Sequence, residues 1–181
     1  MIASISGGLD LGGVPDFLTV SARAGATFVM VREPALSARA LSDLTREIVS
    51  HAARCDLRVL VNDRLDVALA AGAQGVHLRA DGPPVATVRA MTPDGFVIGR
   101  SAHSDDEIDS AAGADYLLYG TIFATPSKPG TPGQGLAALA RAVTRFAGPV
   151  LAIGGITAEN VADVRATGAA GFAAIRMFRI Q

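Results

Sequence analysis

Short apolar runs recur along the chain, separated by segments whose apolar residues repeat with helical spacing. The runs lack polar alternation, which is typical of strands buried on both faces of a parallel sheet. We predict strands at residues 1–6, 27–31, 58–61, 75–78, 96–99, 115–119, 150–153 and 171–175. We predict helices at residues 15–24, 37–53, 65–71, 85–91, 105–112, 136–146 and 158–167.

The alternation of strand and helix favours a (β/α)₈ TIM barrel over an open sheet, and we expect a single α/β domain over residues 1–181. Such barrels typically take about 250 residues, so we expect this one to be trimmed at its C-terminal and N-terminal ends. Only residues 176–181 follow the last predicted strand, which leaves no room for an eighth helix. Apolar barrel surface would then be exposed, and we expect a second copy of the chain to cover it in a homodimer.

Composition narrows the range of partners. The residues are 50% hydrophobic, yet no apolar run reaches the roughly 18 residues that a membrane span needs. The formal net charge of −1 provides no overall field to attract nucleic acid. The one cysteine, Cys55, cannot form an internal disulfide, and the first ten residues lack the pattern of a signal peptide. We therefore expect a cytoplasmic protein that binds neither membranes nor nucleic acid.

One stretch, residues 150–160, has the pattern of a phosphate site. A buried strand leads into Gly154 and Gly155, and Thr157 is placed to cap a following helix. Backbone N–H groups and the positive end of that helix would then converge on an anion. The alternative is a tight strand-to-helix turn that binds no ligand.

Arginines follow several predicted strands. Because the carboxyl ends of barrel strands surround the active site, they would make the mouth locally positive, as a substrate with two phosphate-bearing parts requires. The arginines are Arg32, Arg79, Arg100 and Arg176. The alternative is that some of them pair with Glu33, Asp63 or Asp81, or point into solvent.

Strand parity refines this prediction, because residues two apart on a strand share a face. Arg32 therefore lies on the same strand face as Met30, Arg79 on the same face as His77, and Arg176 on the same face as Ala174 and Phe172. If these faces line the barrel interior, three arginines point into the mouth and His77 is an interior residue just below it.

A proline-rich connection, residues 120–135, carries Thr125, Ser127 and Lys128, the only lysine in the chain. A loop of this length over a barrel mouth is more often functional than connective. Its hydroxyls and its charge are suited to gripping a diphosphate, whereas the alternative is a solvated surface lysine.

With these residues in view, the chain resembles the superfamily of thiamine-phosphate synthases and thiazole tautomerases over residues 28–178. The matching motifs are Val-Arg-Glu at 31–33, Val-Asn-Asp-Arg-Leu-Asp at 61–66, Gly-Val-His-Leu at 75–78, Gly-Arg-Ser-Ala-His at 99–103, Ala-Asp-Tyr at 114–116, Gly-Thr-Ile-Phe at 120–123 and Ala-Ile-Gly-Gly-Ile at 152–156.

The resemblance implies coupling of a hydroxymethylpyrimidine diphosphate to a thiazole phosphate, with Mg²⁺ and basic side chains stabilising the departing diphosphate. It implies as catalytic residues Arg32, Ser101 and Lys128, and as a metal ligand Asp63; Asp81 is the candidate for the second metal ligand. Together with the residues predicted at the barrel mouth, the resemblance gives as substrate-binding residues Asn62, His77, Arg79, His103, Thr125, Gly154, Gly155, Ile175 and Arg176.

The chain departs from the synthase pattern at several of these positions. Met30 and Pro34 replace a glutamine and a lysine, Arg176 replaces a serine, and residues 79–82 shift the second acidic metal ligand by one residue to Asp81. Two alternatives therefore stay open. One is a metal-independent thiazole tautomerase, although Thr121 stands where that branch has its histidine. The other is a protein that binds a thiazole or thiamine phosphate without turnover.

Overall fold

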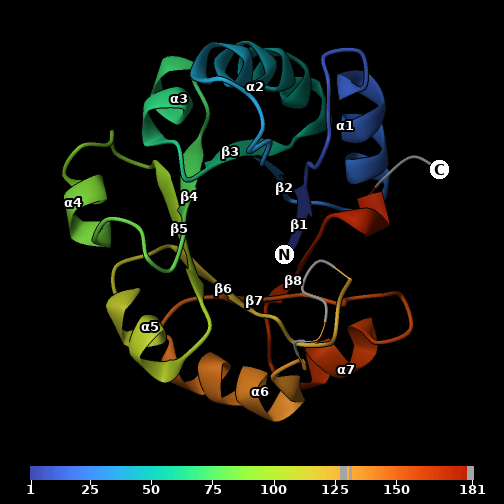
Figure 1. Ribbon diagram of the computed structural model, residues 1–181, viewed down its shortest axis with the longest axis vertical. Helices are drawn as coiled ribbons and strands as arrows, with labels where there is room; N and C mark the ends of the chain where they lie inside the picture. Colours follow the sequence, from blue (N-terminus) through green and yellow to red (C-terminus); the bar gives the residue numbers. More distant parts are fainter. Residues whose placement is uncertain (127–129, 131, 179–181) are drawn as a thin grey trace.

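Eight parallel strands close into a barrel in chain order in the computed structural model, which describes residues 1–126, 130 and 132–178 (Figure 1). β1 pairs with both β2 and β8, which closes the ring. The strands are β1 (Ile2–Ile5), β2 (Phe28–Val31), β3 (Arg58–Asn62), β4 (Gly75–Leu78), β5 (Val97–Ala102), β6 (Tyr116–Gly120), β7 (Val150–Ile153) and β8 (Gly171–Ala174). The predicted TIM barrel is confirmed.

Helices surround the barrel, and each predicted helix has an observed counterpart (Figure 1). They are α1 (Val14–Arg23), α2 (Ala38–Ala52), α3 (Leu65–Ala70), α4 (Val85–Arg89), α5 (Asp105–Ser110), α6 (Gly135–Arg145) and α7 (Val161–Ala166), with short 3₁₀ turns η1 (Ala53–Cys55) and η2 (Arg176–Phe178). The N-cap predicted at Ser37 is confirmed, since its side chain accepts a hydrogen bond from the Ala40 backbone N–H at 3.3 Å. β5 runs three residues further than predicted, and α7 begins three residues later.

The strands divide their side chains between two layers, as a closed parallel barrel requires. The interior cluster is Ala3, Ile5, Phe28, Met30, Leu60, Tyr116, Leu118, Leu151 and Ala173. The opposite faces of the strands pack against the helices in two larger clusters. The three clusters together fix the parity of the strands, and with it which residues at the strand ends face the mouth.

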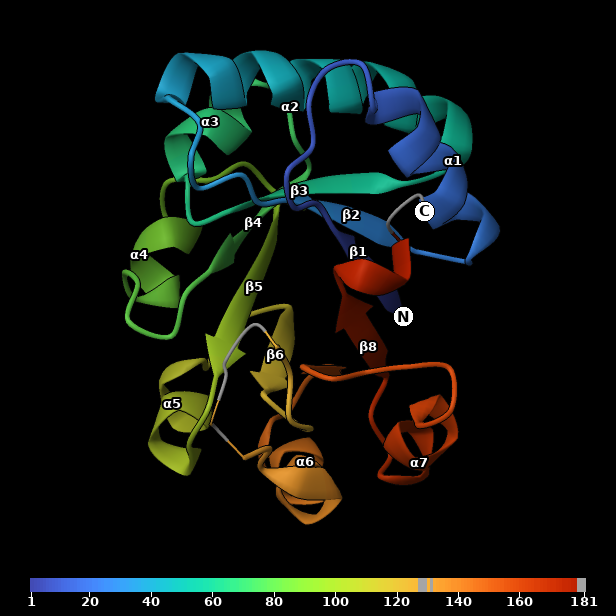
Figure 2. The same cartoon turned by 45° about the vertical axis from the view of Figure 1, so that its right-hand side comes forward.

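The short turn η2 follows β8 and contacts α1 (Figure 2). Phe178 of this turn is 2% exposed, and Phe172 and Ala174 on the outward side of β8 are also buried. The prediction that barrel surface here would be left exposed is therefore wrong for the described residues, because the turn brings its own aromatic side chain onto it. The homodimer stays a prediction.

No helix within the described part of the chain has both the length and the apolar character needed to cross a membrane.

Candidate active site

Two adjoining cavities open at the carboxyl ends of the strands. The first has a volume of about 590 Å³ and is lined by residues that include Arg32, Asn62, Asp63 and Arg79. The second, about 340 Å³, is lined by residues that include Thr125, Gly154, Gly155, Ile175 and Arg176. Arg32, Ser101 and His103 line both cavities, so the two form one continuous site. It brings together all but three of the predicted site residues: His77 and Asp81 line neither cavity, and Lys128 lies outside the described residues.

Arg32 reaches the mouth as predicted. It directly follows β2 and shares the interior face of Met30, which is 1% exposed. Its backbone N–H donates to the hydroxyl of buried Ser6 at 2.9 Å, which ties the end of β2 to the end of β1. The backbone that carries this guanidinium is therefore held by the barrel itself.

Arg176 reaches the mouth by a route that parity did not predict. Phe172 and Ala174 belong to the outer cluster, so the face assigned to Arg176 points away from the interior. β8 ends at Ala174, however, and the turn η2 redirects the chain. Arg176 then lines the second cavity, and its Nη2 donates to the Thr125 hydroxyl at 3.4 Å.

Arg100 does not join the mouth, so its assignment to the positive rim is wrong. Its side chain is on the outer face of β5 and the residue is 4% exposed. The guanidinium donates to the backbone carbonyls of Ala80, Gly82 and Pro83 at 2.5–3.2 Å. Arg100 thus holds the loop after β4 and cannot contact a substrate at the mouth.

The glycine pair turns sharply after β7, with φ of 98° at Gly154 and 66° at Gly155. A Cβ at Gly154 would lie 2.9 Å from Thr121 Cα, and one at Gly155 would lie 2.7 Å from the Ala124 carbonyl oxygen. Both glycines are therefore required by the close approach of the loop after β6. That loop carries Thr125 into the site.

The predicted helix start at Thr157 is wrong. The N-cap residue of α7 is Asn160, and the helix begins at Val161. The Asn160 side chain accepts from the Thr157 N–H at 2.9 Å and donates to the Gly155 carbonyl at 2.9 Å. An asparagine side chain that bonds the preceding backbone competes with an earlier helix start.

Below the mouth, three polar side chains form a chain that is buried at His77 and Tyr116 and half-buried at Ser101. His77 is 2% exposed; its Nε2 lies 2.8 Å from the Ser101 hydroxyl and its Nδ1 lies 2.9 Å from the Tyr116 hydroxyl. The His77 and Tyr116 rings also stack, with centroids 5.5 Å apart. Burial, aided by the nearby charge of Arg100, lowers the pKa of His77 to about 3, so the imidazole is neutral. His77 is an interior residue, as predicted, and it touches the site through Ser101.

The predicted metal ligands lie on either side of Arg79. Its Nη2 is 2.8 Å from Asp81 Oδ2, and its Nη1 is 4.0 Å from Asp63 Oδ2. Within residues 1–126, 130 and 132–178, no three histidine, cysteine or acidic side chains are grouped to hold a metal ion. Mg²⁺ coordinates carboxylate oxygens, and here the Arg79 guanidinium donates a hydrogen bond to Asp81 and lies at ion-pair distance from Asp63. The donor set does not fit Mg²⁺ in this arrangement, and the alternative that Arg79 pairs with acidic neighbours is confirmed.

Residues that we did not predict hold the loops of the mouth. Glu33 is 8% exposed and accepts from the backbone N–H groups of Gly8 at 2.7 Å and Leu9 at 3.1 Å. The Gln134 side chain donates to the Gly120 carbonyl at 3.1 Å, and His103 Nδ1 also bonds this carbonyl. A carbonyl only accepts, so His103 carries its hydrogen on Nδ1 here. The one signal in the sequence for Glu33 was an acidic residue two positions after a buried strand.

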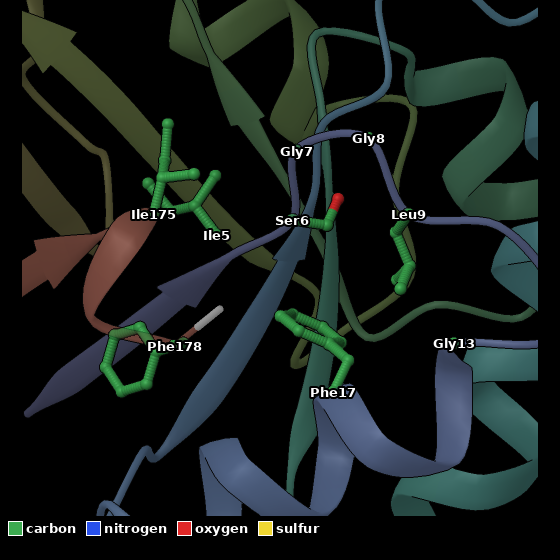
Figure 3. A pocket seen from close by; sticks show the side chains of 9 residues that line it. All are labelled: Ile5, Ser6, Gly7, Gly8, Leu9, Gly13, Phe17, Ile175 and Phe178. Atoms are coloured by element: carbon green, nitrogen blue, oxygen red, sulfur yellow. The ribbon is translucent and has the colours of Figure 1, made fainter. Parts of the chain in front are cut away.

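A third cavity, about 430 Å³, lies beside the mouth between the loop after β1, helix α1 and the turn η2 (Figure 3). Phe17 and Phe178 line it from α1 and η2, and it shares Ile5 and Ile175 with the second cavity. The cavity lies next to η2, which follows β8 in the place where a complete barrel would have its eighth helix.

Comparison with known proteins identifies the family of the chain. The model of the family described as thiamine monophosphate synthase matches residues 8–178. Thiamine-phosphate synthase of Methanoculleus marisnigri is 46% identical over 166 residues, covering 88% of this chain and 77% of the relative. The corresponding protein of Methanoregula boonei is 45% identical over 154 residues, covering 83% and 71%.

A solved structure shows the same relationship. Thiamine phosphate pyrophosphorylase from Pyrococcus furiosus superposes with a TM-score of 0.84 at 30% identity, covering 98% of this chain and 87% of that one. The chain belongs to the thiamine monophosphate synthase family.

Proposed function

We propose that this chain is a thiamine-phosphate synthase that joins a hydroxymethylpyrimidine diphosphate to a thiazole phosphate. The bond between the pyrimidine methylene carbon and the diphosphate oxygen breaks, and the electron pair leaves with diphosphate. The lone pair of the thiazole nitrogen then forms the new carbon–nitrogen bond. Relatives that are 45–46% identical to this chain are named thiamine-phosphate synthase. Their names favour the synthase reaction over the tautomerase and the non-catalytic binder.

One observation carries the proposal: the site has two cavities, each with its own arginines, joined at Arg32, Ser101 and His103. A reaction between two phosphorylated substrates requires two anion sites with a shared wall where the reacting atoms meet. Placement of both substrates in advance also removes much of the entropic cost of bringing them together.

In the first cavity, Arg32, Arg79, Asn62 and Ser101 would hold the diphosphate. The leaving group gains negative charge as its bond breaks, so cations and hydrogen-bond donors fixed beforehand stabilise the transition state more than the ground state. Lys128 would add a further charge from the loop after β6. Arg79 lies between Asp63 and Asp81, the two predicted Mg²⁺ ligands, so in this proposal side chains of the protein stabilise the departing diphosphate.

In the second cavity, the turn at Gly154 and Gly155 and the Arg176 guanidinium would hold the thiazole phosphate. Thr125, which bonds Arg176, would contribute a hydroxyl. Ile175 packs against the interior cluster and lines the same cavity, so it offers an apolar contact for a heterocycle. His103 bonds Gly120 through Nδ1, which leaves Nε2 for a substrate contact.

The proposal is tested by incubating the protein with the pyrimidine diphosphate and the thiazole phosphate and measuring thiamine phosphate and released diphosphate. Equal amounts of both products are expected. Conversion of a thiazole isomer in the absence of the pyrimidine would identify the tautomerase instead. Saturable binding of the thiazole phosphate without any product would identify the binder.

A further inference from the structure

The buried chain of His77, Ser101 and Tyr116 spans three neighbouring strands, β4, β5 and β6. His77 pairs in register with Gly99, and Gly99 pairs with Tyr116. A Cβ at Gly99 would lie 2.1 Å from Cζ of the Tyr116 ring. Gly99 is therefore the gap through which Tyr116 reaches across β5 to His77, beneath the Ser101 hydroxyl.

The hydrogen positions in this chain follow from the donors that must be satisfied. Tyr116 is 1% exposed, and the described hydrogen bond of its hydroxyl is the one to His77 Nδ1. A buried hydroxyl that fails to donate loses about 1–3 kcal/mol, so the Tyr116 O–H donates to Nδ1. Nδ1 is then the acceptor nitrogen, and the single hydrogen of the neutral ring is on Nε2.

The Nε2–H in turn donates to the Ser101 hydroxyl at 2.8 Å. Because Ser101 accepts this bond, its own O–H is not used toward His77 and is directed to its other neighbour, the cavity that it lines. The opposite tautomer would make Ser101 donate into the barrel and present only lone pairs to the cavity. Lone pairs repel phosphate oxygens, whereas an O–H donor attracts them.

We propose that Tyr116 and His77 are positioning residues that fix Ser101 as a hydrogen-bond donor toward the anionic substrate. The substrate is a diphosphate ester if the proposed function holds, and in that respect the inference rests on it. The polarity of the chain itself is independent of which anion binds. Neither His77 nor Tyr116 touches the substrate; both act through one hydroxyl.

The first test needs no variant and no substrate. In protein labelled with ¹⁵N at histidine, NMR distinguishes a protonated ring nitrogen from an unprotonated one. We expect His77 to carry its hydrogen on Nε2, with Nδ1 in the chemical-shift range of an unprotonated nitrogen. A hydrogen on Nδ1 would overturn the proposal whatever the protein catalyses.

The second test is a double-mutant cycle on kcat/KM for the pyrimidine diphosphate. Ser101→Ala removes the donor and should lower kcat/KM by about 10- to 100-fold, the value of a hydrogen bond to a charged group. Tyr116→Phe should also lower it in the wild-type background, because His77 loses its tautomer preference. In the Ser101→Ala background Tyr116→Phe should have no further effect, since its influence passes through the missing hydroxyl.

Equal losses from Tyr116→Phe in both backgrounds would show a general packing defect and overturn the positioning role. Thermal unfolding of each variant shows whether the fold is kept. If the wild type forms no product at all, the proposed function fails, while the NMR measurement still decides the polarity of the chain.

Discussion

At the scale of single residues, arginines that look alike in the sequence have different roles in the structure. Arg32 and Arg100 each directly follow a strand predicted from the sequence, but parity separates them. The interior face carries Arg32 to the mouth, and the outer face carries Arg100 under the loop after β4. Periodicity predicts such faces once one interior residue is known. It failed for Arg176, because a turn after the strand breaks the alternation.

We expect Arg32→Ala to weaken binding of inorganic diphosphate by about 10- to 100-fold, the value of charge-assisted hydrogen bonds to an anion, with little change in melting temperature. Arg100→Ala should lower the melting temperature and leave diphosphate affinity nearly unchanged, because three backbone carbonyls would lose their buried donor. Isothermal calorimetry and thermal unfolding of both variants provide the measurement. Equal diphosphate affinity in Arg32→Ala and wild type would contradict the assignment of the first cavity.

Arg79 gives a prediction about metal. In the wild type its guanidinium hydrogen-bonds Asp81 and lies at ion-pair distance from Asp63. We therefore expect weak Mn²⁺ binding, measured by electron paramagnetic resonance without substrate. Arg79→Ala frees both carboxylates and should bind Mn²⁺ more tightly, whereas adding Asp63→Ala should abolish that gain. The wild type should also keep synthase activity in EDTA. Complete loss of turnover in EDTA would show that a divalent cation is needed despite Arg79.

At the scale of elements, the sequence was sufficient for the strands and helices but not for the connections between them. Buried strands and amphipathic helices are local patterns, and the barrel follows from their alternation. The start of α7 depends on Asn160 bonding back to Gly155, and the conformation of the loop after β1 depends on Glu33, about 25 residues away along the chain. Long-range hydrogen bonds of this kind leave no periodic signal, so the residues that hold the mouth were missed.

The glycine pair provides a test of close approach between elements. Gly155→Ala places a methyl group at positive φ and against the backbone of the loop after β6. Gly25→Ala is the matched control, because Gly25 has φ of 74° and open space where its Cβ would be. We expect the control to cost about 1–2 kcal/mol of unfolding free energy and Gly155→Ala about 2–5 kcal/mol. Urea unfolding measures both, and equal costs would mean that the loop does not pack on Gly155 in solution.

At the scale of the whole molecule, the interior layer links barrel stability to pH. His77 lies in that layer, and burial lowers its pKa from an ordinary value of 6.5 to about 3. The folded protein therefore keeps this ring neutral while the unfolded chain takes up a proton below pH 6.5. Because the unfolded state binds more protons, acid favours unfolding, and the stabilising contribution of neutral His77 is complete only above pH 6.5.

We expect the free energy of unfolding to fall by up to about 1.4 kcal/mol for each pH unit between pH 6.5 and pH 3 on account of this one group. Below about pH 3 both states are protonated at His77, so its contribution stops changing there. Carboxylates add their own slope in the acid range, and His77→Gln, which cannot titrate, provides the reference for subtracting it. Urea unfolding of both proteins from pH 7.5 to 4.5 gives the difference. If the two curves stay parallel over that range, His77 titrates alike in the folded and unfolded states, and the lowered pKa of the buried imidazole is excluded.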